Sequence, residues 1–297
     1  FHKLFITGPI DHGDLQKQIW NNLRLFVAAG LPLDNEDVHL YRQSYVPAHS
    51  EMTWILDCFT GMGEMGRMTE FKDKSSKVGE DRVSVGLYNY PVLMASDILL
   101  YGASYVPVGD DQSQHLEFTR DIAQRMNSKF GELFTVPKAV SEQHEFFGKD
   151  QGLRIKDLAD PTKKMSKSDE SGKGVIFLSE DPEFAAGKIM RATTDDLANI
   201  KYDPQNQPGI SNLIEILALT TGKTKNEVVN EWQGKTSYGD FKQSVADAVR
   251  AFLTDFQAKL AQVSDEAISA KLQTSETVAN QIANETLLRA QKAIGLR

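Results

Sequence analysis

Tyr105-Val-Pro-Val-Gly-Asp-Asp-Gln112 is a short apolar run that ends in a polar turn, and a helical pattern from Gln114 to about Phe130 follows it. This order predicts a strand, a turn and a helix, the unit from which parallel α/β sheets are built. In open α/β sheets ligands bind beyond the carboxyl ends of the strands, and a glycine there lets a ligand approach the backbone. The stretch therefore marks a candidate ligand site, although on its own it also suits an ordinary turn.

The same alternation of strand and helix extends toward the N-terminus. Leu4–Ile6 is a strand candidate that precedes the helical pattern at Leu15–Ala29, which ends at Gly30. Val38–Tyr41 is a second candidate, and the helical pattern at residues 50–59 follows it. The first three-fifths of the chain is therefore expected to form an α/β domain around a parallel sheet.

Beyond Asp181 the pattern is helical throughout. Ser211 is placed to cap a helix that ends before Gly222, because serine accepts hydrogen bonds at helix starts and glycine is common just past helix ends. The two longest amphipathic patterns cover Phe241–Val263 and Glu276–Ile294. An all-helical second domain is therefore expected.

The composition is that of a globular, acidic protein. The 297 residues carry 33 Lys and Arg against 41 Asp and Glu, a formal net charge of −8, and 40% of them are apolar. The length suits about two domains, and no apolar run approaches the roughly 20 residues of a membrane span. The single cysteine, Cys58, excludes an intramolecular disulfide and suits a reducing cytosol. An acidic total argues against indiscriminate coating of nucleic acid.

One apolar helical segment carries an aspartate. Tyr90, Met94, Asp97 and Tyr101 are spaced to share one face of a helix that Pro91 would start. The carboxylate needs a partner, since burying it unpaired is costly. One alternative is a solvent-facing or internally bonded aspartate, and the other is a pocket wall that offers one acceptor to one ligand N–H.

The strongest candidate is the loop Asp160-Pro-Thr-Lys-Lys-Met-Ser-Lys-Ser-Asp169. Lys164 and Lys167 bracket Met165 and Ser166 there. Most lysine clusters are solvated basic loops. Two ammonium groups with two hydroxyls also suit closure over a triphosphate, where they neutralise the charge that develops on a departing pyrophosphate.

Lys164-Met-Ser-Lys-Ser168 resembles the second signature of class I aminoacyl-tRNA synthetases. Five further stretches narrow the resemblance to bacterial tryptophanyl-tRNA synthetases, because they occur in order across nearly the whole chain: Val46–His49, Gly63–Ser75, Tyr90–Asp97, Val106–Gln112 and Pro208–Asn212. The first signature of the class, related to His-Ile-Gly-His, is not recognisable. We therefore expect the family's first strand–helix unit to be missing from this sequence.

The resemblance implies the fold and the reaction. It implies a class I synthetase Rossmann-like domain at residues 1–180, with the lysine loop, and a helical domain at residues 181–297 on the side of the tRNA anticodon. The implied activity is that of a tryptophan--tRNA ligase, which activates L-tryptophan with ATP and transfers it to tRNA(Trp). A cytoplasmic homodimer is implied as well. Mg²⁺ is expected to be held chiefly by the ATP phosphates, and no metal site of the protein is expected.

The resemblance also implies roles for single residues. Those that line or orient the tryptophan are Tyr90, Met94, Asp97, Val106, Val108 and Gln112. Those that bind ATP are Lys74, Gly109, Asp110, Asp111, Ile155, Lys164, Met165, Ser166, Lys167 and Ser168. Among them, the catalytic residues are Lys164, Ser166 and Lys167.

Met94 favours tryptophan over tyrosine as the substrate. Tyrosyl-tRNA synthetases carry glutamine at this position, because a phenol needs polar partners. Methionine offers polarizable apolar surface instead, and the single N–H of an indole can donate to Asp97. Two alternatives stay open: a tyrosyl-type synthetase, and an inactive paralogue that holds tRNA or tryptophan. The missing first signature favours the paralogue, and the intact Lys164–Ser168 loop opposes it.

Overall fold

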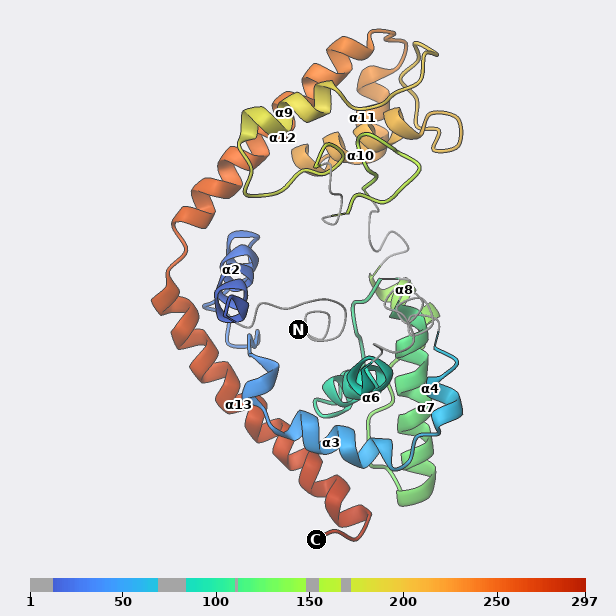
Figure 1. The fold of residues 1–297 in the computed structure, drawn as a ribbon, viewed down its shortest axis with the longest axis vertical. Coiled ribbons are helices and arrows are strands. Elements are labelled where there is room, and N and C mark those ends of the chain that lie inside the picture. The colour runs from blue at the N-terminus through green and yellow to red at the C-terminus, as the bar shows by residue number, and fades with distance from the viewer. Residues whose placement is uncertain (1–12, 69–83, 110–111, 148–154, 167–171) are drawn as a thin grey trace. The chain divides into compact units, whose positions relative to one another are not determined.

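The computed structural model describes residues 13–68, 84–109, 112–147, 155–166 and 172–297 (Figure 1). The chain forms two compact units. The first unit comprises Phe1–Leu23, Pro32–Gln151 and Ser264–Arg297, and the second comprises Arg24–Leu31 and Gly152–Val263. This division is one of spatial contacts and does not coincide with a boundary at residue 180. The functional division at that residue stays a prediction.

Among the described residues of the first unit, the regular structure is helical. The residues of α2 (Leu15–Ala28) are divided between the two units. The other helices that the structure describes in this unit are η1 (Gln43–Tyr45), α3 (Ala48–Asp57), α4 (Met62–Met65), α6 (Val85–Leu99), α7 (Ser113–Phe130), α8 (Val140–Phe147) and α13 (Asp265–Ala293).

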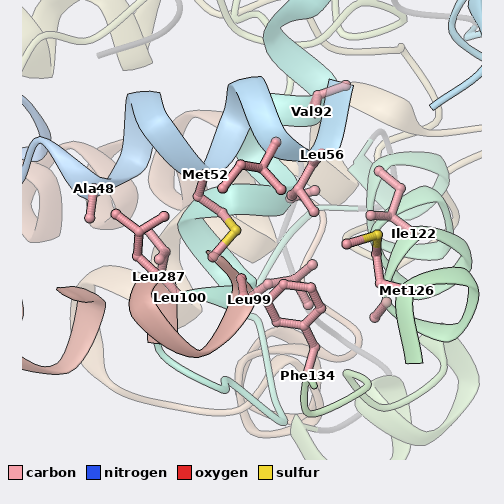
Figure 2. Close-up of a cluster of buried hydrophobic side chains, with 14 of the residues drawn as sticks. Ala48, Met52, Leu56, Val92, Leu99, Leu100, Ile122, Met126, Phe134 and Leu287 are labelled. Atoms are coloured by element: carbon pink, nitrogen blue, oxygen red, sulfur yellow. The ribbon is translucent and has the colours of Figure 1, made fainter. Parts of the chain in front are cut away.

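The core of the first unit lies between α3, α6, α7 and α13 (Figure 2). Met52 and Leu56 stand one turn apart on α3, so they point to the same side and are fully buried. They pack in one cluster with Leu99, Ile122 and Leu287. Burying each such side chain stabilises the fold by about 1.5–3 kcal/mol. The cluster fixes α6, which carries three of the candidate tryptophan residues.

The second unit is built from α9 (Pro182–Met190), α10 (Pro208–Thr221), α11 (Lys225–Trp232) and α12 (Tyr238–Ala261). Its core joins apolar side chains of α9, α10 and α12, among them Ile189, Ile210, Leu213, Phe241 and Val245. Residues 172–297 are all described, and their regular structure is helical.

Helix ends follow local signals in most places. Gly222 ends α10 with φ of 69°, a left-handed conformation that glycine adopts without strain. Thr224 and Glu227 form a reciprocal capping box at the start of α11. The predicted cap at Ser211 is wrong, because α10 begins at Pro208 and Ser211 lies inside it. Proline suits a first turn, where its missing N–H is not needed.

Three other helix starts differ from the predictions. Helix α6 begins at Val85, where the Ser84 hydroxyl accepts from the Leu87 N–H, so Pro91 lies inside the helix instead of starting it. Helix α12 begins at Tyr238 behind a Ser237 cap. Helix α13 begins at Asp265, 11 residues before the predicted start at Glu276, behind a Ser264 cap. Serine caps outweigh the apolar pattern at each of these starts.

The predicted parallel sheet does not appear among the described residues. Leu4–Ile6 lies outside them, and Val38–Tyr41 and Tyr105–Val108 are irregular. A ladder of strands needs backbone-to-backbone hydrogen bonds. Here the backbone N–H groups of Leu40 and Val106 donate to the side chains of Ser275 and Gln143 instead. In the described part of the chain, no helix is long and apolar enough to cross a membrane.

Candidate functional site

Gln43 and His49 both contact the carboxylate of Asp97, which lies on α6 in the first unit. Its Oδ1 accepts a hydrogen bond from Gln43 Nε2 at 2.7 Å and lies 2.6 Å from His49 Nδ1. An ionised carboxylate only accepts, so His49 Nδ1 carries the proton between them. The Asp97 side chain is 26% exposed, which leaves it open to solvent or a ligand. The expectation that this aspartate has a partner is confirmed, with the bonding internal to the protein.

His49 joins Asp97 to a pair of tyrosines. The His49 side chain is 3% exposed, and its Nε2 lies 2.8 Å from the Tyr101 hydroxyl. Tyr41 packs against Tyr101 with ring centroids 5.4 Å apart. Burial and a hydrogen bond with Tyr41 raise the pKa of Tyr101, and burial raises the pKa of Tyr41. Both phenols are therefore protonated at neutral pH, and Tyr101 can donate to the histidine.

The main chain of His49 is fixed as well. The hydroxyls of Thr53 and Ser96 donate to its carbonyl oxygen at 2.7 and 2.9 Å. Thr53 lies on α3 and Ser96 on α6, next to Asp97. The hydrogen bond from Ser96 therefore links α6 to α3 at His49, the residue that contacts the Asp97 carboxylate.

Tyr90 and Met94 lie on α6 before Asp97. Tyr90 is buried, and its hydroxyl lies 2.8 Å from Nε2 of His115 on α7. This contact joins the two helices beside the turn that precedes α7. Met94 is half-buried and stands three residues before Asp97, so both side chains lie on neighbouring positions of one helix surface.

The candidate ligand turn is anchored at both of its described ends. The Val106 N–H donates to Gln143 Oε1 at 2.7 Å, and Tyr105 stacks on Phe146 with ring centroids 4.0 Å apart. The Gln112 N–H donates to the Gly109 carbonyl at 2.8 Å. Val108 is half-buried between these anchors. Asp110 and Asp111, which were predicted to bind ATP, lie outside the described residues.

The lysine hairpin, residues 155–166, belongs to the second unit. Lys156 and Lys164 form an antiparallel bridge, the Met165 N–H donates to the Ile155 carbonyl at 2.9 Å, and the Asp157 N–H donates to the Lys163 carbonyl at 3.0 Å. The structure therefore brings Ile155 beside Lys164 and Met165. Lys167 and Ser168 lie outside the described residues, as does Lys74.

The two apolar candidates of the hairpin face the helices. Ile155 and Met165 line an apolar cavity of about 390 Å³ together with side chains of α10 and α12, such as Ile216 and Val249. Lys164 and Ser166, which flank Met165, are exposed. Because side chains alternate along an extended chain, the apolar anchor keeps the ammonium and hydroxyl groups in solvent.

Gln43 and His49 are the polar residues at Asp97 that the sequence did not single out for a role. His49 occurred only within a family motif, and no local pattern marks Gln43, which lies 54 residues from Asp97. In the part of the chain that the structure describes, no three His, Cys, Asp or Glu side chains gather as a metal site requires.

A family model and several known proteins that match this sequence belong to the same family. The family model described as "tRNA synthetases class I (W and Y)" matches residues 13–254. A tryptophan--tRNA ligase of Leifsonia xyli is 44% identical over 292 residues, which are 98% of this chain and 84% of that protein. A tryptophan--tRNA ligase of Corynebacterium glutamicum is 46% identical over 267 residues, covering 89% of this chain and 75% of that protein.

Two solved structures of tryptophanyl-tRNA synthetases have folds similar to that of this chain. The tryptophanyl-tRNA synthetase of Mycoplasma pneumoniae has a TM-score of 0.83 at 34% identity and covers 100% of this chain and 86% of its own. The tryptophanyl-tRNA synthetase of Campylobacter jejuni, complexed with ADP and tryptophan, has a TM-score of 0.75 at 28% identity. That match covers 99% of this chain and 88% of the other.

Proposed function

Because this chain belongs to the class I tRNA synthetases (W and Y), we propose that it is a tryptophan--tRNA ligase. It activates L-tryptophan with ATP and transfers the tryptophanyl group to tRNA(Trp). The observation that carries the proposal is the carboxylate of Asp97, fixed by Gln43 and His49 on the helix that also carries Met94. The names of relatives that cover nearly the whole chain support the same substrate.

Asp97 and Met94 select the amino acid. The indole ring has one N–H donor and no acceptor, and Asp97 accepts that hydrogen. Met94 packs its thioether against the apolar ring. Tyr90, Val106, Val108 and Gln112 complete the pocket around the tryptophan. A ligand without an N–H at this position desolvates the carboxylate without giving it the additional hydrogen bond that an indole donates, so the site disfavours it.

The first chemical step forms an adenylate. A carboxylate oxygen of tryptophan attacks the α-phosphorus of ATP in line, the new P–O bond forms, and the bond to pyrophosphate breaks. The protein supplies no nucleophile, so its contribution is positioning and charge stabilisation. Lys164, Ser166 and Lys167 neutralise the charge that develops on pyrophosphate, with Met165 and Ser168 in the same loop.

The remaining ATP contacts come from the turn and the hairpin. Gly109, Asp110 and Asp111 bind the nucleotide at the turn, the Ile155 main chain contacts adenine, and Lys74 adds a further phosphate contact. Mg²⁺ arrives with ATP and is held chiefly by the phosphates, as its preference for phosphate and water oxygens favours.

The second step uses the tRNA. The terminal ribose hydroxyl attacks the carbonyl carbon of the adenylate, the ester bond forms, and AMP leaves. The helical part at residues 181–297 approaches the anticodon, and the enzyme works as a cytoplasmic homodimer.

Pyrophosphate exchange into ATP tests the proposal, with tryptophan and tyrosine supplied in parallel to the full-length protein. We expect exchange with tryptophan alone. Exchange with tyrosine alone would instead identify a tyrosyl-type synthetase. Tryptophan binding without exchange would identify an inactive paralogue. A Lys164→Ala variant serves as the control for the lysine hairpin, and we expect it to slow exchange without weakening tryptophan binding.

A further inference from the structure

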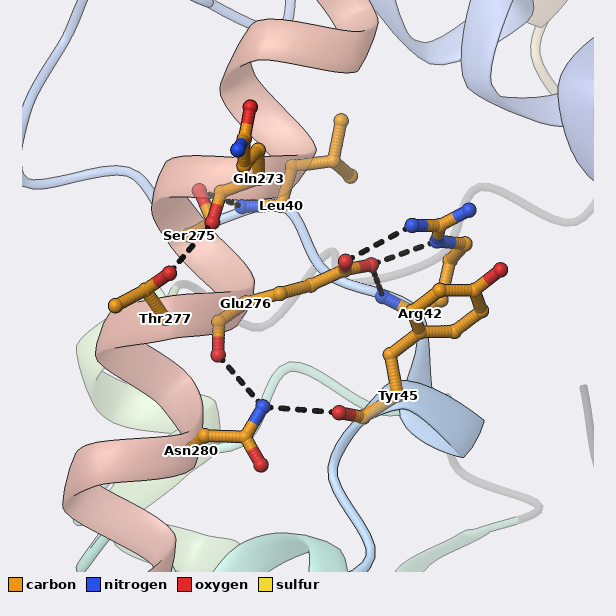
Figure 3. A network of polar contacts seen from close by, with 8 residues as sticks. All are labelled: Leu40, Arg42, Tyr45, Gln273, Ser275, Glu276, Thr277 and Asn280. Atoms are coloured by element: carbon orange, nitrogen blue, oxygen red, sulfur yellow. Dashed lines mark hydrogen bonds and ion pairs between the residues drawn. The ribbon is translucent and has the colours of Figure 1, made fainter.

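A carboxylate of α13 holds both the main chain and the side chain of Arg42 (Figure 3). Glu276 Oε1 accepts from the Arg42 backbone N–H at 3.2 Å and from Arg42 Nε at 2.6 Å. Glu276 Oε2 accepts from Arg42 Nη2 at 2.9 Å. This is a bidentate pair with a third bond to the backbone, a geometry that fixes orientation as well as position. The hydrogen bond with Glu276 raises the pKa of Arg42.

The pair is shielded from water. The side chains of Arg42 and Glu276 are 19% and 11% exposed. The guanidinium of Arg42 also lies over the ring of Tyr45, 3.4 Å from its centroid. Removing one charge leaves the other desolvated without a partner, so both groups are needed to hold the geometry.

Two neighbours of Glu276 bind the same segment, Leu40–Tyr45. Ser275 Oγ accepts from the Leu40 N–H at 3.2 Å, and Asn280 Nδ2 donates to the Tyr45 carbonyl at 2.9 Å (Figure 3). The segment is therefore bound to α13 at its two ends and at Arg42 in the middle. Side chains of α13 therefore form hydrogen bonds with the backbone of this segment, as the backbone of a neighbouring strand would in a sheet.

The residues on either side of Arg42 both connect to Asp97, Gln43 directly and Tyr41 through other side chains. Arg42 is extended, with φ of −93° and ψ of 122°, so its side chain points to one side and those of Tyr41 and Gln43 to the other. Gln43 donates directly to Asp97 Oδ1. Tyr41 packs on Tyr101, which reaches Asp97 through His49. Fixing Arg42 therefore sets the position of both supports.

We propose that Glu276 is a positioning residue of the amino-acid pocket. It acts through Arg42 to hold Gln43 and Tyr41 in place, and these orient the Asp97 carboxylate toward the indole N–H. The inference rests on the proposed function, in which Asp97 recognises tryptophan. It gives α13 a part in substrate selection, although Glu276 lies 234 residues from Arg42 in sequence.

The test uses the full-length protein with Glu276→Gln, which keeps the size of the side chain and removes its charge. We expect the KM for tryptophan in pyrophosphate exchange to rise about tenfold, because a charge-assisted hydrogen bond is lost. The Kd for tryptophan without ATP, measured by calorimetry, should rise in parallel. The KM for ATP should stay within about twofold of wild type, because the residues proposed to bind ATP lie on other segments than Leu40–Tyr45. A purely structural role would not separate the two substrates.

Three further variants sharpen the result. Lys271→Ala on the same helix removes the bond from Lys271 Nζ to the Asn35 carbonyl, and it should leave the KM for tryptophan unchanged. Arg42→Lys keeps the charge but loses the bidentate geometry, so it should also raise that KM and serves if Glu276→Gln does not fold. Gln43→Ala combined with Glu276→Gln should raise it no further than the larger single effect.

Failure of the inference differs from failure of the proposed function. A wild-type protein that neither exchanges nor binds tryptophan overturns the proposed function, and the role of Glu276 falls with it. A wild-type protein that exchanges with tryptophan, paired with Glu276→Gln and Arg42→Lys variants whose KM for tryptophan is unchanged, overturns the role of Glu276 alone.

Discussion

The side-chain amide of Asn212 makes both of its hydrogen bonds to the main chain of Lys156. Asn212 Oδ1 accepts from the Lys156 N–H at 2.7 Å, and Asn212 Nδ2 donates to the Lys156 carbonyl at 3.0 Å. The amide thus makes the pair of backbone hydrogen bonds that a residue of a neighbouring strand would make. Because Lys156 is bridged to Lys164, this side chain links helix α10 to the lysine hairpin.

Replacing Asn212 tests that link. Asn212→Ala leaves the half-buried N–H and carbonyl of Lys156 without this partner, so we expect a loss of about 1–3 kcal/mol in the free energy of unfolding. The KM for ATP should rise while the KM for tryptophan stays constant. Urea unfolding and pyrophosphate exchange measure the two effects. Asn206→Ala, an exposed asparagine of the same unit, is the matched control, and an unchanged KM for ATP in the Asn212 variant would refute the link.

The support of Asp97 by His49 gives a second prediction. His49→Ala removes the bond to Asp97 Oδ1 and the bond to Tyr101, so the carboxylate loses its fixed orientation. We expect the Kd for tryptophan to rise about tenfold, as suits a lost hydrogen bond to a charged group. Calorimetry with tryptophan alone measures this. His39→Ala changes an exposed histidine and should have no effect, and equal affinities in the two variants would contradict the assignment.

Met94 gives a prediction about specificity. Met94→Gln places a polar amide one turn before Asp97, where the amide is desolvated by an indole ring without bonding to it. The kcat/KM for tryptophan should fall about tenfold or more, since a buried amide without partners is costly. Met190→Gln, at an exposed position of α9, is the control. If tryptophan activation survives Met94→Gln intact, the residue does not line the pocket.

Asp195 gives a prediction about pH. Burial alone would raise the pKa of its carboxyl, but hydrogen bonds from Tyr238, the Leu197 N–H and Gln207 lower it overall. The folded-state pKa therefore lies below the unfolded value of about 3.9. The stabilisation is complete above the unfolded value and is lost as pH falls through the folded one.

The measurement is urea unfolding of wild type and Asp195→Ala between pH 2.5 and 7. The variant should be less stable near neutrality, and the gap should narrow as the pH falls below about 4 and through the folded-state pKa, where the carboxyl of the folded wild type becomes protonated. Asp196→Ala removes an exposed neighbouring carboxylate and serves as control. A gap that widens on acidification would reverse the sign and exclude this account.

Local signals in the sequence predicted the helices well. The pattern at Leu15–Ala29 corresponds to α2 at Leu15–Ala28, and the pattern at Gln114–Phe130 corresponds to α7 at Ser113–Phe130. Periodicity and end signals are properties of neighbouring residues, so they are visible without a structure. The start of α13 was missed because its first turns are mostly polar and only the Ser264 cap marks it.

Long-range partners explain what the sequence did not show. Val38–Tyr41 has the composition of a strand, yet its backbone donor at Leu40 goes to Ser275, 235 residues away. The need of Asp97 for a partner follows from its apolar surroundings, but the identity of His49 depends on how α3 packs on α6. Tertiary packing decides both, and no local pattern encodes it.

The first unit is assembled from three stretches of the chain, and the ribosome makes the last of them well after the other two. Residues 32–151 are synthesised before the main part of the second unit, residues 152–263, and α13 comes later still. At about 5–20 residues per second, the interval is on the order of ten seconds. During it, Met52 and Leu56 lack the core surface that Ala283 and Leu287 supply. The nascent N-terminal part is therefore exposed to aggregation, and the pocket matures only when α13 joins it.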